Sequence, residues 1–151
     1  MRSYLVVVDE TPEARAALRY AARRAAGSHG RVEILAIVPP QEFVQWGAVQ
    51  AAMEEEARLR AEAMGLQAAS ALDEESQVEH AVIVRQGEPV KAITDLLRER
   101  DDIAALVLGA AREGGPGPLV SHFAGAVAGT LPCPLIIVPG RMEDEAHDPL
   151  S

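Results

Sequence analysis

The sequence predicts an α/β protein in which five parallel β-strands form one layered domain. Short apolar runs rich in β-branched residues alternate with helical patterns along nearly the whole chain, which is typical of consecutive βαβ units. The chain has 151 residues, which fits one domain, and 48% of them are hydrophobic, as in an ordinary globular core. No internal repeat and no inter-domain linker is visible.

The first predicted unit joins a buried strand to a helix. Residues 4–8 are continuously apolar, as in a central parallel strand that is covered on both faces, and Asp9 ends this run. Thr11 suits the cap of the following helix, and Glu13 suits the positive end of its dipole. Gly27 is predicted to end that helix.

The middle of the chain carries two more units of the same kind. Residues 32–38 form the second predicted strand, and residues 44–72 form a long helical segment rich in Ala, Glu and Arg. Three consecutive glutamates, residues 54–56, are interpreted as a solvated face of this helix. A third strand is predicted at residues 78–84, followed by a helix that starts near Pro89.

The last part of the chain supplies two strands and a loop. The strands are predicted at residues 103–108 and 135–138. Between them, a Gly- and Pro-rich loop at residues 109–118 leads into a helix of small residues at 119–130. Residues 141–151 are rich in Asp and Glu and are predicted to form a flexible tail, so the folded domain is expected to end near residue 140.

Charge and composition exclude several classes of protein. The chain has 23 acidic against 14 basic side chains and a net charge of −9, the wrong sign for a nucleic-acid-binding protein. Every apolar run is interrupted before the roughly 20 residues that a membrane-spanning helix needs. A single cysteine, Cys133, and a start unlike a signal peptide favour the cytoplasm.

Three segments together resemble one known family. Val6-Val7-Val8-Asp9 precedes an Ala-rich helix, Leu108-Gly109 opens a glycine-rich loop, and Pro132-Cys133-Pro134 leads into the last strand. Over roughly residues 3–140, this arrangement resembles the universal stress protein family. The resemblance implies an open five-stranded parallel sheet in the order 3-2-1-4-5, with helices on both faces, the adenine nucleotide alpha-hydrolase-like fold.

The resemblance also implies a place for a nucleotide. Nucleotide-binding members hold ATP between the first and fourth strands, where the strand order reverses and ligands of open sheets bind. By resemblance, Asp9 contacts adenine, Val38 lies in the apolar wall of the adenine pocket, and Gly109 begins the phosphate loop. The structural alternatives are that Asp9 accepts hydrogen bonds at a helix start and that Val38 is simply core.

The phosphate-loop pattern of the nucleotide-binding members is broken in this chain. That pattern is Gly-x-x-Gly, nine further residues and Gly-Ser or Gly-Thr. Arg112 stands at the second glycine, and either Ser121 and His122 or His122 and Phe123 stand at the final pair. Two prolines in the loop lack amide hydrogens that could bind a phosphate. These departures predict weak or no ATP binding.

An alternative remains open for the same loop. Gly114, Gly115 and Gly117 could form a displaced anion nest, with Arg112 as a charge-assisted contact to phosphate. The protein would then be an ATP- or AMP-binding stress sensor, with Mg²⁺ on the phosphates of ATP. His122 would be a phosphate contact only if it faces the crevice.

No catalytic or metal site is predicted. The four histidines have no spacing that resembles a metal site, and Cys133 has no cysteine partner nearby in the sequence. Neither a nucleophile elbow nor a P-loop is present. An aromatic cluster at residues 43–46, including Trp46, is interpreted as a lid, a partner surface or core packing.

The leading expectation is a cytoplasmic, non-enzymatic stress-response homodimer that acts through protein partners not identifiable from the sequence. The last strand, Leu135 to Val138, is apolar and predicted to lie at a sheet edge, where unpaired backbone groups need protection. The family resemblance implies that the same strand of a second subunit supplies it.

Overall fold

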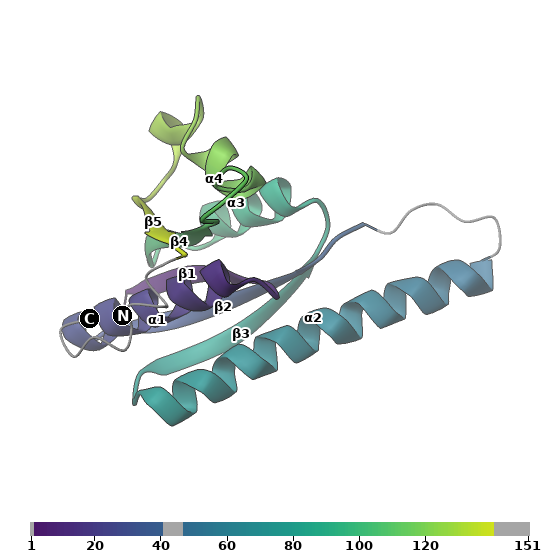
Figure 1. Cartoon of the computed structure of the whole chain (residues 1–151), viewed down its shortest axis with the longest axis horizontal. Helices are drawn as coiled ribbons and strands as arrows, with labels where there is room; N and C mark the ends of the chain where they lie inside the picture. The colour runs from purple at the N-terminus through teal and green to yellow at the C-terminus, as the bar shows by residue number, and fades with distance from the viewer. Residues whose placement is uncertain (1, 41–46, 141–151) are drawn as a thin grey trace.

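The computed structural model describes residues 2–40 and 47–140, which form a single five-stranded parallel sheet (Figure 1). Its order is β3-β2-β1-β4-β5, so the implied order 3-2-1-4-5 is confirmed. The strands are β1 (Ser3–Val8), β2 (Arg31–Val38), β3 (Glu79–Gln86), β4 (Ile103–Ala110) and β5 (Leu135–Pro139).

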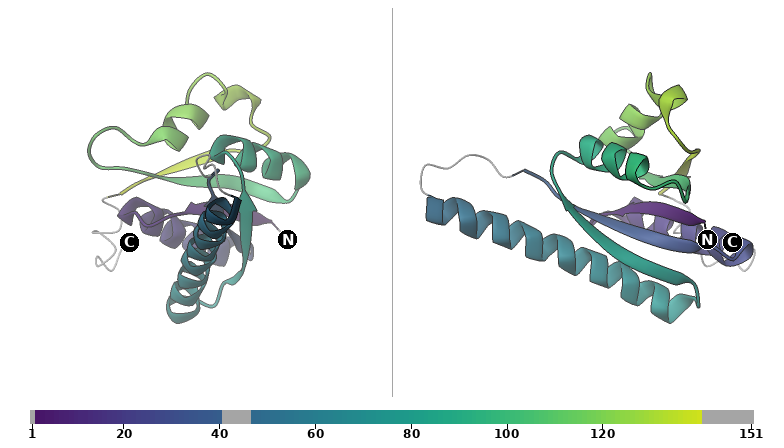
Figure 2. Two further views of the ribbon diagram at one scale, coloured as in Figure 1. Left: turned by 90° about the vertical axis from the view of Figure 1, so that its right-hand side faces the viewer. Right: turned by 180° about the vertical axis from the view of Figure 1, so that it is seen from behind.

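Helices cover both faces of this sheet, as the family resemblance implied (Figures 1 and 2). One face carries α1 and α2, and the other carries α3 and α4. A short 3₁₀ helix follows α4. Their bounds are α1 (Pro12–Ser28), α2 (Gly47–Glu75), α3 (Pro89–Glu99), α4 (Pro118–Phe123) and η1 (Ala128–Thr130).

The continuous apolar runs of the central strands follow from burial on both faces. Along β1, Val6 and Val8 pack into the core beneath α1 and α2, while Leu5 packs into the core beneath α3 and α4. In β2, Ile34 and Leu35 divide between the two cores in the same way. Because successive side chains of a strand point to opposite faces and both faces are covered, most positions of these two strands are buried.

The start of α1 has the predicted cap, whereas its end differs from the prediction. The hydroxyl of Thr11 accepts a hydrogen bond from the amide of Ala14 at 3.3 Å. The helix continues through Gly27 to Ser28, and His29 takes the left-handed conformation with φ 58°. Gly30 follows, where a Cβ would lie 2.7 Å from the carbonyl oxygen of Arg2. The glycine that this turn requires is therefore Gly30, because of the close backbone approach.

The prediction was also wrong around the glycine-rich loop. Strand β4 runs to Ala110, which pairs with Pro139 of β5, so Gly109 belongs to the strand. The predicted helix at 119–130 is α4, which ends at Phe123, followed by turns and η1. Two glycines and several exposed alanines occupy the segment after Phe123. Such residues bury little surface and glycine disfavours helix, so a continuous helix is not stabilised there.

Some predictions fall outside the described residues. These are the flexible tail at residues 141–151, the aromatic cluster at residues 43–46 and the start of the long helix at residue 44. Among residues 2–40 and 47–140, no helix combines the length and apolar character needed to cross a membrane.

Candidate functional site

A crevice opens at the carboxyl ends of β1 and β4, the neighbouring strands where the sheet order reverses. After β1 the chain enters α1 on one face, and after β4 it continues toward α4 on the other face. The two connections diverge and leave a hollow of about 210 Å³. The crevice therefore lies at the position that the family resemblance implied.

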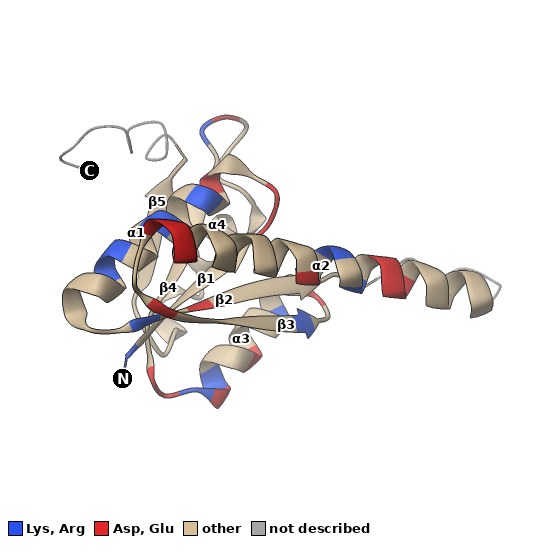
Figure 3. Ribbon diagram, turned by 90° about the horizontal axis from the view of Figure 1, so that it is seen from below, with Lys and Arg blue, Asp and Glu red and all other residues tan. Residues whose placement is uncertain are grey.

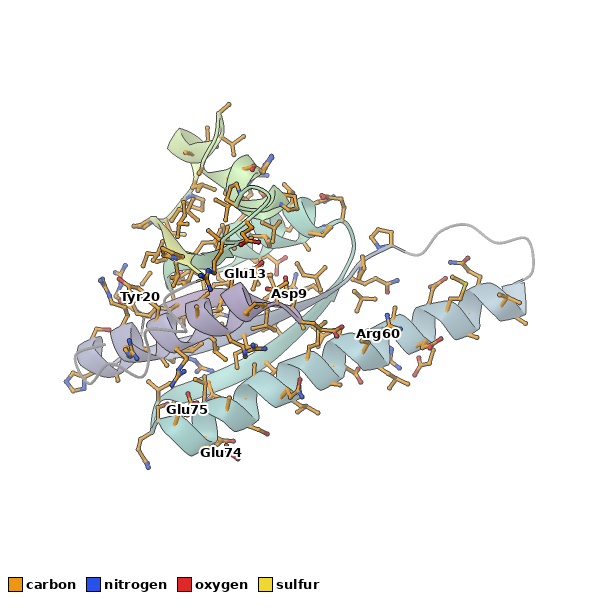
Figure 4. The ribbon with its side chains drawn as sticks, in the orientation of Figure 1. Asp9, Glu13, Tyr20, Arg60, Glu74 and Glu75 are labelled. Carbon is orange, nitrogen blue, oxygen red and sulfur yellow. The ribbon has the colours of Figure 1, made fainter. Side chains whose placement is uncertain are left out.

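Asp9 lines this crevice and is held at the start of α1 (Figure 4). Its Oδ1 accepts hydrogen bonds from the amide of Thr11 at 2.9 Å and from the hydroxyl of Thr11 at 2.5 Å. Thr11 in turn caps α1 through Ala14. The carboxylate thus has the structural role of ordering the turn into α1, and it is still exposed to the crevice.

Gly109 lies at the opposite wall of the crevice, near the end of β4. A Cβ at this position would collide with the backbone carbonyl of Glu13 in the first turn of α1. A glycine is therefore required here by the close packing of α1 against β4.

Only one of the three candidate loop glycines reaches the crevice. Gly114, Gly115 and Gly117 have φ of 74°, 89° and 107°, the left-handed region that glycine adopts without strain. Gly117 lines the crevice together with Pro116 and Pro118, whereas Gly114 and Gly115 do not line it. The structure therefore does not gather the three glycines into one nest facing this hollow.

Four more candidate residues lie elsewhere, Val38, Arg112, Ser121 and His122. Val38 is buried in the core, and Ser121 is exposed on α4 away from the crevice lining. Arg112 lines a separate hollow beside Pro139, beyond the end of β4. His122 packs edge-on against the Phe123 ring, with centroids 5.0 Å apart, and lines a hollow next to α3. None of the four lines the crevice between β1 and β4.

Glu13 is a crevice residue whose position the sequence analysis missed. Its side chain lies on the first turn of α1, and Figure 4 shows Glu13 and Asp9 at the same end of that helix. A Cβ built on Gly140 would lie 3.4 Å from the Cβ of Glu13, so Glu13 faces β4 and β5. The available signal was its place in the first turn of the helix that begins just after Asp9, at the carboxyl end of a central strand.

The charge of the crevice is negative. Among the described residues that line it, Asp9 and Glu13 are acidic and none is a lysine, arginine or histidine. Among the lining residues that the structure describes, only Thr11 has a hydroxyl, which donates to Asp9 and accepts from the amide of Ala14. The lining is otherwise made of apolar residues, glycines and prolines, so it offers little that would attract an anion.

A second, larger hollow adjoins the crevice at Asp9. It has a volume of about 450 Å³ and lies between α1 and α2. Leu18 and Met64 contribute apolar surface to it, and Arg15 lies on its rim. The two hollows share Asp9 and Ala14, so a ligand in the crevice could extend toward α2.

The described residues contain neither a metal-binding cluster nor a thiol with a lowered pKa. Among residues 2–40 and 47–140, no group of three His, Cys, Asp or Glu side chains is arranged to hold a metal ion. Cys133 is partly buried, and burial raises the pKa of its thiol, with a weaker opposing effect from a backbone hydrogen bond to Leu106. A raised pKa favours the protonated thiol over the nucleophilic thiolate.

The chain belongs to the universal stress protein family, whose model matches residues 1–139. Solved structures with the same fold include universal stress protein UspA from Lactobacillus plantarum, which is 21% identical, with a TM-score of 0.77 over 91% of this chain and 97% of that one. Another is the universal stress protein from Archaeoglobus fulgidus in complex with dAMP, at 21% identity and TM-score 0.67 over 91% and 98% of the chains.

A third similar structure is a universal stress protein family protein from Arabidopsis thaliana with AMP bound. It is 13% identical, with a TM-score of 0.61 over 100% of this chain and 99% of that one. No curated protein sequence matches the chain.

Proposed function

We propose that this universal stress protein is non-enzymatic, acts through contacts with other proteins, and binds adenine nucleotides weakly or not at all. The observation that carries the proposal is the lining of the crevice between β1 and β4. Two acidic residues, Asp9 and Glu13, line this space, and none of the described lining residues is cationic. A nucleotide phosphate placed there would meet charges of its own sign.

The loop adds a second reason to expect weak phosphate binding. Phosphate loops bind through backbone amides that point at the anion. Two of the residues at the mouth of this crevice, Pro116 and Pro118, have no amide hydrogen. The space beside Gly109 that a side chain would fill is occupied by the backbone of Glu13 in α1, so it is not free for a phosphate.

The lining also supports a non-enzymatic role. Turnover of a nucleotide needs a nucleophile or an activated water together with a base or a metal ion. The one hydroxyl of the described lining, on Thr11, is engaged in hydrogen bonds at the start of α1. The described lining thus offers no free hydroxyl nucleophile, and it has no cationic side chain beside Asp9 and Glu13 to stabilise the charge that develops on a reacting phosphate.

The second candidate function is an adenine-nucleotide sensor. It is favoured by the position of the crevice at the strand reversal, and by structural neighbours whose titles report bound dAMP or AMP. On this reading Asp9, Gly109 and Gly117 hold the nucleotide. With ATP, Mg²⁺ on the phosphates would offset the repulsion from the two carboxylates.

Calorimetric titration of nucleotide-stripped protein separates the two functions. We expect no binding heat for ATP with Mg²⁺ up to about 1 mM, which corresponds to a binding free energy weaker than about 4 kcal/mol. Micromolar binding that is lost in Asp9→Ala and kept in Glu10→Gln would establish the sensor instead. Glu10 is a matched acidic control because it follows Asp9 but lines only the neighbouring hollows.

A homodimer is the proposed assembly. Strand β5 pairs with β4 on one side and is the last strand of the described sheet. Its Ile137 side chain is 41% exposed, and its outer edge carries backbone groups suited to pairing with another strand. We propose that β5 of a second copy pairs with it in the antiparallel direction.

A further inference from the structure

Helix α2 packs on the sheet through one narrow side. Its buried residues are Ala57, Ala61, Gly65 and Leu72, which follow helical spacing and face β2 and β3. The contact is close, since a Cβ at Gly65 would lie 2.5 Å from Cγ1 of Val82. The part of α2 before Ala57 has no buried residue and runs past the ends of β2 and β3 (Figures 1 and 2).

The opposite side of α2 is also apolar. Four large hydrophobic side chains are exposed among the described residues, and three of them lie on α2. They are Val49, Leu59 and Leu66, with exposed fractions of 44%, 53% and 64%. A single exposed leucine needs no explanation, whereas a row of them on one helix marks a contact surface.

These side chains belong to a row with heptad spacing. Successive members are three and four residues apart, the spacing of the contact positions of a two-stranded coiled coil. This row, the outer row of α2, consists of Val49, Ala52, Glu56, Leu59, Ala63 and Leu66. All six residues are exposed. Figure 3 shows this side of the helix uncovered by any other described segment.

The charges beside the outer row indicate the partner. Glu55 and Glu62 flank the row on one side, where both also pair with Arg58 of the same helix at 2.6 Å, and Arg60 flanks the row on the other side. In a parallel coiled coil, a residue on the glutamate side of the row lies opposite a residue on the arginine side of the partner helix, five positions later in the sequence. Glu55 would therefore face Arg60 of the partner subunit. An antiparallel pair would bring the glutamates of the two helices together.

We propose that the outer row of α2 binds the outer row of α2 in a second copy of this chain, parallel and in register. Leu59 and Leu66 then pack against the same residues of the partner. This contact is separate from the β5 edge, because α2 covers the β2 and β3 end of the sheet. The proposal does not depend on nucleotide binding.

The contact is expected to be weak. From Val49 to Leu66 the row spans about 26 Å of helix, and so short a pair buries less than the roughly 1,200 Å² of stable interfaces. Glu56 also lies within the row, so a parallel pair places two carboxylates opposite each other. Arg60 of the same chain lies 3.9 Å from Glu56 and offsets part of that repulsion.

Sedimentation equilibrium measures self-association through the outer row of α2. Every protein in this test carries Ile137→Lys, which removes the β5 contact. Leu59→Glu should abolish association. Glu56→Leu should tighten association about tenfold or more, because it replaces the repelling pair by an apolar one. Arg23→Leu, which adds the same side chain at an exposed position of α1, is the matched control and should change nothing. No effect of Glu56→Leu, or an equal gain in Arg23→Leu, would overturn the proposal.

Disulfide cross-linking tests the orientation. Ala52→Cys, Leu59→Cys and Leu66→Cys are made singly with Cys133→Ser and oxidised at high protein concentration. In a parallel, in-register pair each cysteine faces itself, so all three variants should cross-link. Cross-linking of Leu59→Cys alone would indicate an antiparallel pair, and cross-linking of none would indicate no pair. Either result would contradict the proposal.

Discussion

At the scale of single residues, Gly109 shows how a presumed ligand-binding glycine can have a purely structural cause. It has no left-handed backbone, and the carbonyl of Glu13 occupies the space of its missing side chain. Gly109→Ala would push α1 away from β4. We expect a loss of about 1–3 kcal/mol in the free energy of unfolding, as for other overpacked sites, measured by chemical denaturation.

The control for this prediction is another glycine. Gly27 lies inside α1, with nothing within 4 Å of an added Cβ. Gly27→Ala should stabilise the protein by about 0.5–1 kcal/mol, because alanine is the better helix former. Equal effects of the two substitutions would show that the close approach at Gly109 is unimportant.

The candidate site could be predicted from the sequence only where it depends on the ends of strands. Asp9 and Gly109 line the crevice, since the carboxyl ends of adjacent parallel strands meet at one edge of a sheet, and their contact with a nucleotide stays a prediction. The loop residues were less predictable. Which of Arg112, Gly114 or Gly117 faces the crevice depends on the path of the loop, and a sequence pattern does not contain that path.

At the scale of elements, the end of α3 and the start of β4 are joined to β2 by a charged cluster. Glu33 is 3% exposed, and Nη2 of Arg100 lies 3.1 Å from its Oε1. Arg100 also donates two hydrogen bonds to Asp102, both at 2.7 Å. Nε of Arg31 lies 3.1 Å from the same Glu33 oxygen, in a geometry that makes no hydrogen bond.

Removal of Arg100 should therefore be costly. Arg100→Met leaves the buried carboxylate of Glu33 without its hydrogen-bonding cation, and we expect a loss of about 2 kcal/mol or more. Lys91→Met removes an exposed ion pair with Asp95 and serves as the matched control. It should have little measurable effect, because exposed pairs contribute little. Denaturant unfolding of both variants at pH 7 measures the two losses in unfolding free energy. Similar losses would contradict the stabilising role of Arg100.

The same cluster predicts how stability depends on pH. Hydrogen bonding to Arg100, aided by the Ser3 hydroxyl, holds the pKa of Asp102 well below its usual range. A carboxyl whose pKa is lowered by folding stabilises the protein above its unfolded pKa of about 3.9, and that stabilisation is lost as the pH falls below this value. The difference in unfolding free energy between wild type and Asp102→Asn should be largest near pH 7 and shrink toward pH 3. A difference in unfolding free energy that does not change with pH would contradict a stabilising role for the ionised Asp102 carboxylate.

The elements themselves were largely predictable, and the exceptions have physical causes. The five strands followed from apolar runs that are buried on both faces, as Leu5 and Val6 of β1 show. The predicted helix at 119–130 was wrong because small residues suit several backbone conformations. The outer row of α2 was not predicted from the sequence either. Apolar residues on two opposite sides of a helix weaken the periodic pattern that would mark a single buried face.

At the scale of the whole molecule, assembly through β5 has a direct test. Ile137→Lys places a charge on the outermost strand and should convert the dimer to a monomer at tens of micromolar protein, an order-of-magnitude concentration for weak association. Light scattering measures the mass. Leu59→Glu on α2 is the control, since it should leave the β5 dimer intact. A wild-type monomer under these conditions would reject the β5 dimer.

The central claim concerns the two carboxylates of the crevice. Glu13→Gln removes one of them while keeping the size of the side chain, so it should strengthen ATP binding if charge repulsion is what excludes the phosphates. Calorimetric titration of nucleotide-stripped wild type and Glu13→Gln with ATP and Mg²⁺ measures this most directly. We predict no binding by wild type up to about 1 mM and detectable binding by Glu13→Gln. Micromolar binding by wild type, unchanged or weakened in Glu13→Gln, would contradict the account.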